Sequence, residues 1–551
     1  MRVPVRHIAV LLFSASMAQA DAKDFQCPRD DVWTLSTGAE QALERCEWPE
    51  AARLYVCAAR ESDDPAVAER ATRSAYDNFQ LARAVDAAKR WLELAPDSEV
   101  ARRYLATGLL RLYAEDAAAQ QFAELLKTSY SDRARGYLVL LGILSAEGND
   151  TGAARIMEGL AAADAASPEA QYASSVLWQR AEHGAKALAA AERAAALRAG
   201  WPQAELARVR ALATCGRDQE ALKLSSELAT QDDSFLRISH AWFLLEQHRR
   251  DEAVTLFGEL RRSGGPVAGD ATAALAAVAV DEGRLDDAAR LLDEAARNPE
   301  QVETLRWHVG RIAEERGDEA GAARQYQGIE SGPRALTSQL RAYRLLRKLG
   351  AGTLAEVLID DYLSASPAET ADVVAGIAAV LVEEGRGDDA IALVDRALTL
   401  MPDDGLLLAR GFLLDRLDRV PEAIKDLREV ASRRPNDPMA QNALGYTLVD
   451  RSRSVDEGYR LIERALAAKP DSYAVQDSMG WALVQMGRLE DGKAWLDKAW
   501  KRSEDPEVAA HLGETLWRMG REDDARGLWD EALADNPDSP PLKRAIERHP
   551  K

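Results

Sequence analysis

Residues 444–458 read LGYTLVDRSRSVDEG, residues 479–492 read MGWALVQMGRLEDG, and residues 512–525 read LGETLWRMGREDDA. In each stretch a glycine follows a large apolar residue, and a second small residue comes 12 or 13 positions after that glycine. Small residues facing each other let two antiparallel helices approach closely, whereas larger side chains would push them apart. The three stretches therefore predict helix–turn–helix hairpins.

The small residue that begins the second half of each hairpin recurs along almost the whole chain. Successive members of this series are 32 to 35 residues apart, and they are Ala51, Ala84, Ala118, Ala153, Ala187, Ala221, Ala253, Ala288, Ala322, Ala355, Ala390, Ala423, Gly458, Gly492 and Ala525. A period near 34 residues is typical of helical repeat arrays. In such arrays each unit is expected to pack only on its neighbours, so that stability is roughly a sum of nearest-neighbour contributions.

Turn residues occur where this periodicity requires helix ends. Gly-Arg pairs at 216–217, 283–284, 385–386, 487–488 and 520–521 precede acidic stretches such as Glu522-Asp523-Asp524. Glycine suits the end of a helix, and carboxylates suit the first turn of the next one. Prolines, which cannot continue a helix, close the units at Pro402, Pro435, Pro470, Pro506 and Pro537.

This pattern resembles the tetratricopeptide repeat (TPR) family and implies an all-α superhelical solenoid of about 14–15 repeats. The resemblance is fullest over 375–540, weaker over 206–374 and degenerate over 21–205, with a signal peptide over 1–20 and a charged C-terminal cap over 541–551. The tryptophan that the family carries early in the first helix is replaced here by Leu407, Gln441, Gln476 and Ala509.

The N-terminus predicts export. Arg2 and Arg6 precede an apolar run at 8–13, and Ala18-Gln19-Ala20 then forms an A-x-A cleavage site. The apolar run is too short to span a bilayer. Cys27 follows Asp24-Phe25-Gln26, which is not a lipidation box, so no lipid anchor is expected. We expect a periplasmic protein, and we expect any association with the outer membrane to be peripheral, held by a partner or a surface contact.

Three of the four cysteines lie at the N-terminal edge, where export would favour a disulfide. Cys46 is expected at the end of the first helix and Cys57 about three turns into the second. Because the second helix runs back, Cys57 returns towards Cys27, and this pair fits disulfide geometry better than either pairing with Cys46. The alternative is three unpaired buried thiols. We expect Cys215 to be a core residue.

Composition and motifs argue against nucleic-acid binding and against catalysis. The formal charge of −21 opposes binding to nucleic acid or anionic lipid, where Lys and Arg supply most of the affinity. The sequence contains no HExxH, CxxC, GxSxG, GxGxxG, SxxK or P-loop motif, and no two histidines have metal-ligand spacing on one helical face. We therefore expect no enzyme activity, no cofactor and no metal site.

The first helices of the C-terminal repeats offer a candidate partner-binding groove. In the TPR pattern the position after the small residue of a first helix faces inward. The groove candidates are Phe412, Tyr446 and Trp481 at that position, Trp517 one turn further on in the last repeat, and Asn442 and Asp477 one turn before Tyr446 and Trp481. Aromatic side chains and a backbone-pairing amide suit an extended or helical peptide. The alternative is that the rings fill the clefts between repeats.

Residues 441–446, 477–481 and 511–517 also resemble a proteobacterial envelope subgroup of TPR proteins. Members of this subgroup are typically outer-membrane lipoproteins, and some are adaptors for carboxyl-terminal processing proteases. The resemblance implies a scaffold that presents substrates to such a protease, although the missing lipid box departs from the subgroup. The alternative is a component of an export or outer-membrane assembly machine.

Overall fold

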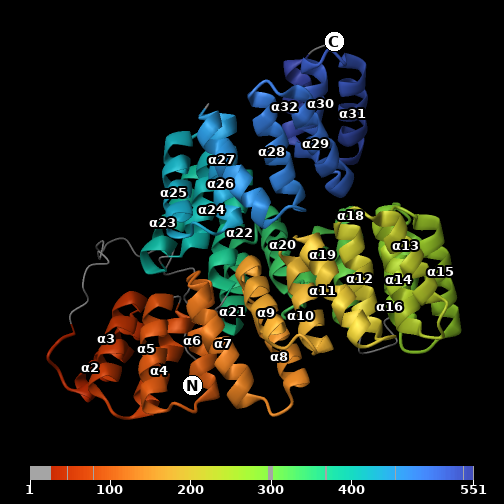
Figure 1. Ribbon diagram of the computed structural model, residues 1–551. Helices are drawn as coiled ribbons and strands as arrows, with labels where there is room; N and C mark the ends of the chain where they lie inside the picture. The colour runs from red at the N-terminus through yellow and green to blue at the C-terminus, as the bar shows by residue number, and fades with distance from the viewer. Residues whose placement is uncertain are drawn as a thin grey trace. The chain divides into compact units, whose positions relative to one another are not determined.

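The computed structural model describes residues 27–45, 47–78, 80–295, 302–366, 369–401, 403–452, 454–537 and 539–549. Within these ranges the chain forms 31 α-helices and no strand (Figure 1). The helices form fifteen consecutive pairs, α2/α3 through α30/α31, followed by a final helix α32. The prediction of an all-helical array of about 14–15 helix pairs is confirmed for the described residues. The predicted signal peptide and Cys46 lie outside the described residues.

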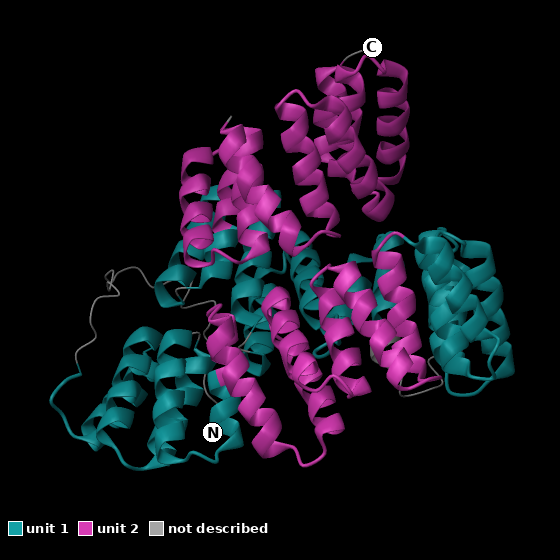
Figure 2. Cartoon of the chain, viewed as in Figure 1, with its two compact units in different colours: residues 1–105, 217–409 teal, residues 106–216, 410–551 magenta. Residues whose placement is uncertain are grey.

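The chain divides into two compact units, each built from two separated stretches of sequence (Figure 2). Unit 1 comprises Met1–Leu105 and Arg217–Ala409, and unit 2 comprises Ala106–Gly216 and Arg410–Lys551. The predicted division points at 205/206 and 374/375 fall inside helices α12 and α22. Those points therefore separate stretches that match the repeat pattern to different degrees, and they are not the boundaries of the compact units.

The helices of unit 1 are α2 (Val32–Glu44), α3 (Trp48–Glu61), α4 (Pro65–Asp77), α5 (Leu81–Leu94), α13 (Asp218–Ala229), α14 (Ser234–Glu246), α15 (Arg250–Ser263), α16 (Ala268–Asp281), α17 (Leu285–Ala295), α18 (Val302–Glu315), α19 (Glu319–Gln327), α20 (Ala335–Lys348), α21 (Gly352–Ala365), α22 (Thr370–Glu383) and α23 (Gly387–Leu400). Those of unit 2 are α7 (Glu115–Ser129), α8 (Arg133–Ser145), α9 (Asp150–Ala163), α10 (Pro168–Arg180), α11 (Gly184–Leu197), α12 (Pro202–Thr214), α25 (Val420–Arg433), α26 (Pro438–Arg451), α27 (Val455–Ala468), α28 (Tyr473–Gln485), α29 (Leu489–Ser503), α30 (Pro506–Arg518), α31 (Glu522–Asp535) and α32 (Pro540–Arg548). The unit boundaries at 105/106 and 409/410 fall within α6 (Glu99–Arg111) and α24 (Asp404–Arg416).

The fifteen small residues of the periodic series occupy one structural position. Each is the fourth residue of the second helix of its pair, and each is buried. This includes Ala118 and Ala187, which lie in the degenerate N-terminal stretch of the sequence. The period read from the sequence is therefore the period of the helix pairs.

Facing glycines in the C-terminal pairs bring the backbones into direct contact. A Cβ added at Gly458 would lie 2.5 Å from the carbonyl oxygen of Gly445, and one added at Gly492 would lie 2.8 Å from that of Gly480. No side chain fits at such distances, because packed protein interiors leave no room for an extra methyl group.

The turns between paired helices have the geometry that their residues predict. The glycines before the second helices adopt positive φ, between 70° and 79°, at Gly216, Gly283, Gly385, Gly487 and Gly520. The residue after each of these glycines is an arginine, which forms an ion pair with the acidic residue three positions later. The same ion pair occurs in two further turns that lack the glycine. The seven pairs are Arg217–Glu220, Arg249–Glu252, Arg284–Asp287, Arg386–Asp389, Arg419–Glu422, Arg488–Asp491 and Arg521–Asp524. These pairs are largely exposed, so each contributes little to stability. Their recurrence assigns the acidic runs to helix starts.

Glutamine replaces the family's tryptophan in two of the C-terminal first helices. Gln441 donates from Nε2 to the carbonyl oxygen of Ala431 at 3.3 Å, and Gln476 donates to that of Pro470 at 2.8 Å. Both acceptors belong to the end of the preceding repeat. A buried hydrogen bond thus joins successive repeats where the family places an aromatic ring.

Contacts within unit 2 also join repeats that are far apart in the sequence. The Tyr113 hydroxyl donates to Oδ2 of Asp437 at 2.9 Å, across 324 residues, and the backbone N–H of Gly184 donates to Oδ2 of Asp471 at 2.8 Å, across 287 residues. The expectation that each repeat packs only on its neighbours is therefore wrong. These bonds add non-neighbour interactions to the stability of the unit.

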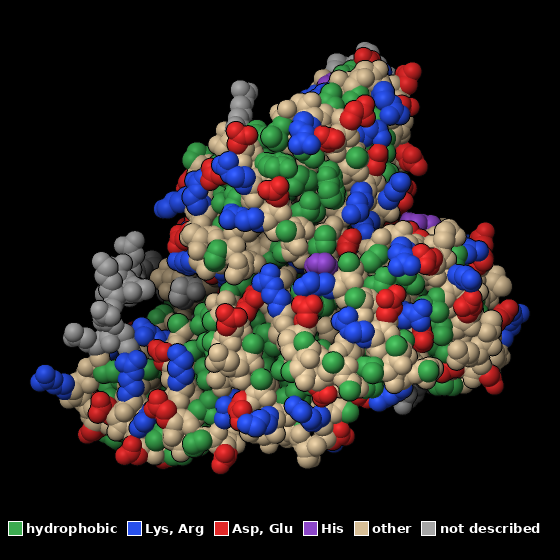
Figure 3. Space-filling model, in the orientation of Figure 1, with side chains coloured by type: hydrophobic (Ala, Val, Ile, Leu, Met, Phe, Trp, Pro, Cys, Tyr) green, Lys and Arg blue, Asp and Glu red, His purple; other side chains and the backbone are tan. Residues whose placement is uncertain are grey.

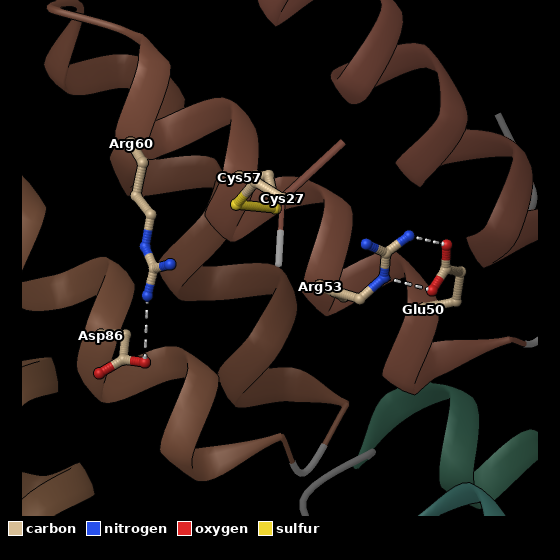
Figure 4. Close-up of a disulfide and its surroundings, with 6 residues drawn as sticks. All are labelled: Cys27, Glu50, Arg53, Cys57, Arg60 and Asp86. Carbon is tan, nitrogen blue, oxygen red and sulfur yellow. Dashed lines mark hydrogen bonds and ion pairs between the residues drawn. A yellow bond between two sulfur atoms is a disulfide. The ribbon is translucent and has the colours of Figure 1, made fainter. Parts of the chain in front are cut away.

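At the N-terminal edge the structure joins Cys27 to Cys57 of α3, with their Cα atoms 5.4 Å apart (Figure 4). Cys57 is fully buried beside Leu35 of α2, and Cys27 packs against the same cluster. The disulfide thus fastens the segment before α2 onto the first helix pair. Cys215 takes no part in a disulfide and is only half-buried, so the expectation of a core residue there is only partly met.

The last helix, α32, buries Leu542 and Ala545 against the final repeat, as expected of a cap. No helix in the described ranges is long and apolar enough to cross a membrane.

The glycine contact in α26/α27 predicts a position-specific effect. Replacing Gly458 by Ala should destabilise the C-terminal repeats by roughly 1–3 kcal/mol through overpacking. The matched control is Gly527→Ala in α31, where an added Cβ meets nothing within 4 Å. That change should be neutral or stabilising by up to about 1 kcal/mol, because alanine favours helix over glycine. Urea unfolding followed by circular dichroism measures both, and equal effects at the two sites would contradict the close-contact assignment.

Candidate partner-binding groove

The sequence-predicted groove residues lie on successive first helices of unit 2. Phe412 on α24, Tyr446 on α26 and Trp481 on α28 each follow the glycine that contacts the second helix. Because that glycine faces the partner helix, the next residue points to a different side of the first helix. Glu514 on α30 holds the same position in the last repeat.

Burial separates these equivalent residues. The side chain of Phe412 is 46% exposed, Tyr446 is half-buried, and Trp481 is only 4% exposed. Trp481 belongs to the hydrophobic core of the last repeats, so its assignment to an open groove is wrong. The alternative interpretation, in which the ring fills the cleft between repeats, holds for this residue.

The neighbours of Trp481 explain its burial. The imidazole of His511 stacks on the indole, with ring centroids 4.4 Å apart and planes inclined by 17°. The indole N–H donates to Oδ1 of Asp450 at 3.0 Å, and the guanidinium of Arg518 lies 5.3 Å from the ring centroid. Every polar and apolar part of the side chain therefore already has a partner.

Asp477 is also engaged inside the protein. It is buried, and its carboxylate oxygens lie 2.9 and 3.1 Å from Nδ1 of His511. The hydroxyl of Tyr446 reaches across to α30, where it donates to Glu507 at 2.8 Å and lies 3.4 Å from Nε2 of His511. Burial, followed by the charge of Glu507, raises the pKa of Tyr446 well above 10, so the hydroxyl stays protonated.

Trp517, the remaining aromatic candidate, is half-buried beneath the C-terminal cap. The centroid of its ring lies 4.5 Å from that of the His549 imidazole, which also contacts Trp529. Nε2 of His549 donates to Oε2 of Glu514 at 2.7 Å. Burial by itself raises the pKa of Glu514, but bonds from His549 and Arg518 lower it overall. The repeat pattern did not predict this cluster, although Glu514 falls at the position that follows the glycine of the first helix.

What stays accessible is a set of large apolar side chains on three successive first helices. Met439 of α26 is 59% exposed and Tyr473 of α28 is 40% exposed, alongside Phe412 of α24. Figure 3 shows hydrophobic side chains gathered over α28 and the adjoining edge of α26, with charged side chains around them. Met439 and Tyr473 were not among the predicted groove residues. Met439 precedes Gly445 by six positions, and Tyr473 precedes Gly480 by seven.

Asn442 keeps one unused hydrogen-bonding atom on this side of α26. Its Oδ1 is buried and has no partner within the described residues. An amide oxygen in this state can accept a backbone N–H from a bound peptide after a small side-chain rotation.

Comparison with known proteins identifies the repeats. Residues 239–303, 408–473 and 478–540 match the tetratricopeptide repeat family model. A TPR repeat-containing protein of Pseudomonas aeruginosa is 32% identical over 214 residues, which cover 39% of this chain and 36% of that protein. The match thus spans about a third of that relative's length.

Among solved structures, yeast Tom70 matches at 14% identity over 85% of this chain and 98% of that chain, with a TM-score of 0.34. A thermophilic TPR protein of Thermus thermophilus matches at 23% identity over 32% of this chain and 97% of that chain, with a TM-score of 0.29.

The burial difference predicts opposite outcomes for two truncations at equivalent positions. Trp481→Ala should cost roughly 3–5 kcal/mol, because it removes a fully packed ring. Phe412→Ala should change stability by less than about 1 kcal/mol, since almost half of the side chain is already in water. Thermal melting of the two variants compares these effects. Similar losses of stability would show that Phe412 is also a core residue.

Proposed function

We propose that this chain, which carries tetratricopeptide repeats, is a non-catalytic scaffold that binds partner proteins through the first helices of its C-terminal repeats. TPR folds generally mediate protein–protein interactions. The observation that carries the proposal is the exposure of Phe412, Met439 and Tyr473 on three successive first helices. These lie within the stretches that match the TPR family model.

The occupant that we propose for this surface is an extended segment of a partner protein. Phe412 and Met439 offer large apolar contact area, which typically supplies most of the binding free energy of an interface. Asn442 beside them offers an acceptor for the backbone of the segment. The exposed carboxylates of Asp450 and Glu507 favour a segment that also carries Lys or Arg.

We further propose that the protein acts in the periplasm after removal of residues 1–20. The charged and apolar leader ending in Ala18-Gln19-Ala20 supports this proposal. The pairing of Cys27 with Cys57 supports it as well, because disulfides persist mainly in oxidising compartments. Association with the outer membrane, if any, would then be peripheral.

The specific role that we propose is presentation of substrates to a carboxyl-terminal processing protease. Its support is the resemblance of residues 441–446, 477–481 and 511–517 to TPR adaptors of such proteases. The second candidate is a part in an export or outer-membrane assembly machine. The identity of the captured partner distinguishes the two.

The groove proposal predicts where a partner can be crosslinked. A photocrosslinking residue placed at Met439 should capture the protease or its substrate in the periplasm, and the double variant Phe412→Ala/Met439→Ala should weaken binding of the purified partner. Truncating an interface anchor of this kind to alanine typically weakens the binding free energy by roughly 2 kcal/mol or more. The matched control is Leu354→Ala in α21, which is 61% exposed but lies outside the groove. Equal crosslinking from position 354, or unchanged binding by the double variant, would contradict the proposal.

The export proposal predicts the covalent state of the mature protein. Protein recovered from the periplasm should have the mass of a chain beginning at Asp21, without a lipid adduct. Non-reducing peptide mapping should recover Cys27 linked to Cys57. A retained leader would refute export, and a bridge to Cys46 would refute the assigned pairing.

A further inference from the structure

Three successive first helices meet at a single buried imidazole. His511 of α30 is buried, and its Nδ1 lies 2.9 Å from the carboxylate of Asp477 on α28. Its Nε2 lies 3.4 Å from the hydroxyl oxygen of Tyr446 on α26. That hydroxyl is in turn 2.8 Å from Glu507, one turn before His511 on α30. Tyr446 and His511 therefore tie α26, α28 and α30 together.

The donors and acceptors in this chain of bonds can be assigned. A carboxylate only accepts hydrogen bonds, and a tyrosine hydroxyl has one hydrogen to donate. Because Tyr446 donates that hydrogen to Glu507, its oxygen can only accept from Nε2 of His511. Asp477 likewise requires a proton on Nδ1. Both ring nitrogens therefore donate, which makes His511 an imidazolium.

The charges around His511 support this state. Burial disfavours the imidazolium and lowers the pKa, but the charge and the hydrogen bond of Asp477, with smaller effects of Glu507 and Asp450, raise it overall. The guanidinium of Arg518 lies 5.3 Å from the centroid of the Trp481 ring, on which the imidazole of His511 also stacks. The positive charge of Arg518, which would disfavour the imidazolium, is paired with the carboxylate of Glu514 at 3.0 Å.

We propose that His511 is a proton-operated clasp of the C-terminal repeats. In this clasp the imidazolium holds the Tyr446 hydroxyl against Glu507, so that α26 stays fastened to α30 and Trp481 stays covered. Loss of the Nε2 proton turns that nitrogen into an acceptor, while Nδ1–H remains on Asp477. The Tyr446 hydroxyl then donates to Nε2 in place of Glu507. The hydrogen bond from Tyr446 on α26 to Glu507 at the start of α30 is then lost, and the carboxylate of Glu507 becomes available to pair with a cation.

The clasp makes the stability of these repeats depend on pH in a defined direction. A histidine whose pKa is raised in the folded state stabilises it fully below about pH 6.5, the ordinary value, and less as pH rises through the folded pKa. The contribution of His511 is therefore greatest at mildly acidic pH and falls on the alkaline side.

Imidazole nitrogen NMR of the full mature chain, labelled at histidine with ¹⁵N, tests the clasp. At pH 6.5 one histidine should show two protonated nitrogens, and its signals should disappear in His511→Gln. Its titration midpoint should lie above 6.5 and should fall in Asp477→Asn, which keeps the shape of the site. A single protonated nitrogen on His511 at pH 6, or a midpoint at or below 6.5, would overturn the proposal.

A second readout does not depend on how well His511→Gln folds. Tyr446→Phe keeps the ring and the His511–Asp477 pair but removes the switching hydroxyl. In the wild type, quenching of tryptophan fluorescence by acrylamide should increase between pH 6.5 and 9, and most of that increase should be absent in Tyr446→Phe. His549→Gln is the matched control, because it removes a half-buried imidazole that also contacts tryptophan rings, and it should keep the increase. An increase retained in Tyr446→Phe would show that Tyr446 is not the moving part.

Discussion

The close approach of two antiparallel helices at one small residue is the constraint on which the rest of this protein depends. The fourth residue of every second helix is alanine or glycine and is buried in all fifteen pairs. Where both helices contribute glycine, as at Gly445 and Gly458, the backbones themselves are in contact. This contact fixes the rotation of each first helix about its axis, and so fixes which residues can face away from the pair.

One position on the first helices then serves different purposes in different repeats. The residue after the glycine is Phe412, Tyr446, Trp481 or Glu514, and its environment depends on the next repeat along the chain. Trp481 is covered because the following repeat supplies His511, and Glu514 is engaged because the cap supplies His549. Phe412 stays exposed. Among the first helices of the C-terminal repeats, exposed large apolar side chains therefore lie on α24, α26 and the start of α28, where we place the partner.

Polar side chains connect the repeats in two ways, between neighbours and between stretches that are far apart in the sequence. Gln441 and Gln476 bond to the end of the preceding repeat, which is a neighbour interaction. The bonds from Tyr113 to Asp437 and from Gly184 to Asp471 join stretches more than 280 residues apart. A loss of either acceptor would leave a partly buried donor without this bond, which is more costly than the loss of an exposed ion pair.

The sequence alone determined the helical period, the pairing of helices and the positions of the turns, because these follow from local requirements: a small residue at a close contact, a glycine with positive φ, a carboxylate at a helix start. It also indicated Cys27 and Cys57 as the pair that antiparallel helices bring together. Only the tertiary structure decided which inward-facing aromatics are open. That depends on side chains one repeat later, as between Asp477 and His511, and on contacts between distant stretches. A period describes where a side chain points, whereas exposure depends on what another part of the chain places over it.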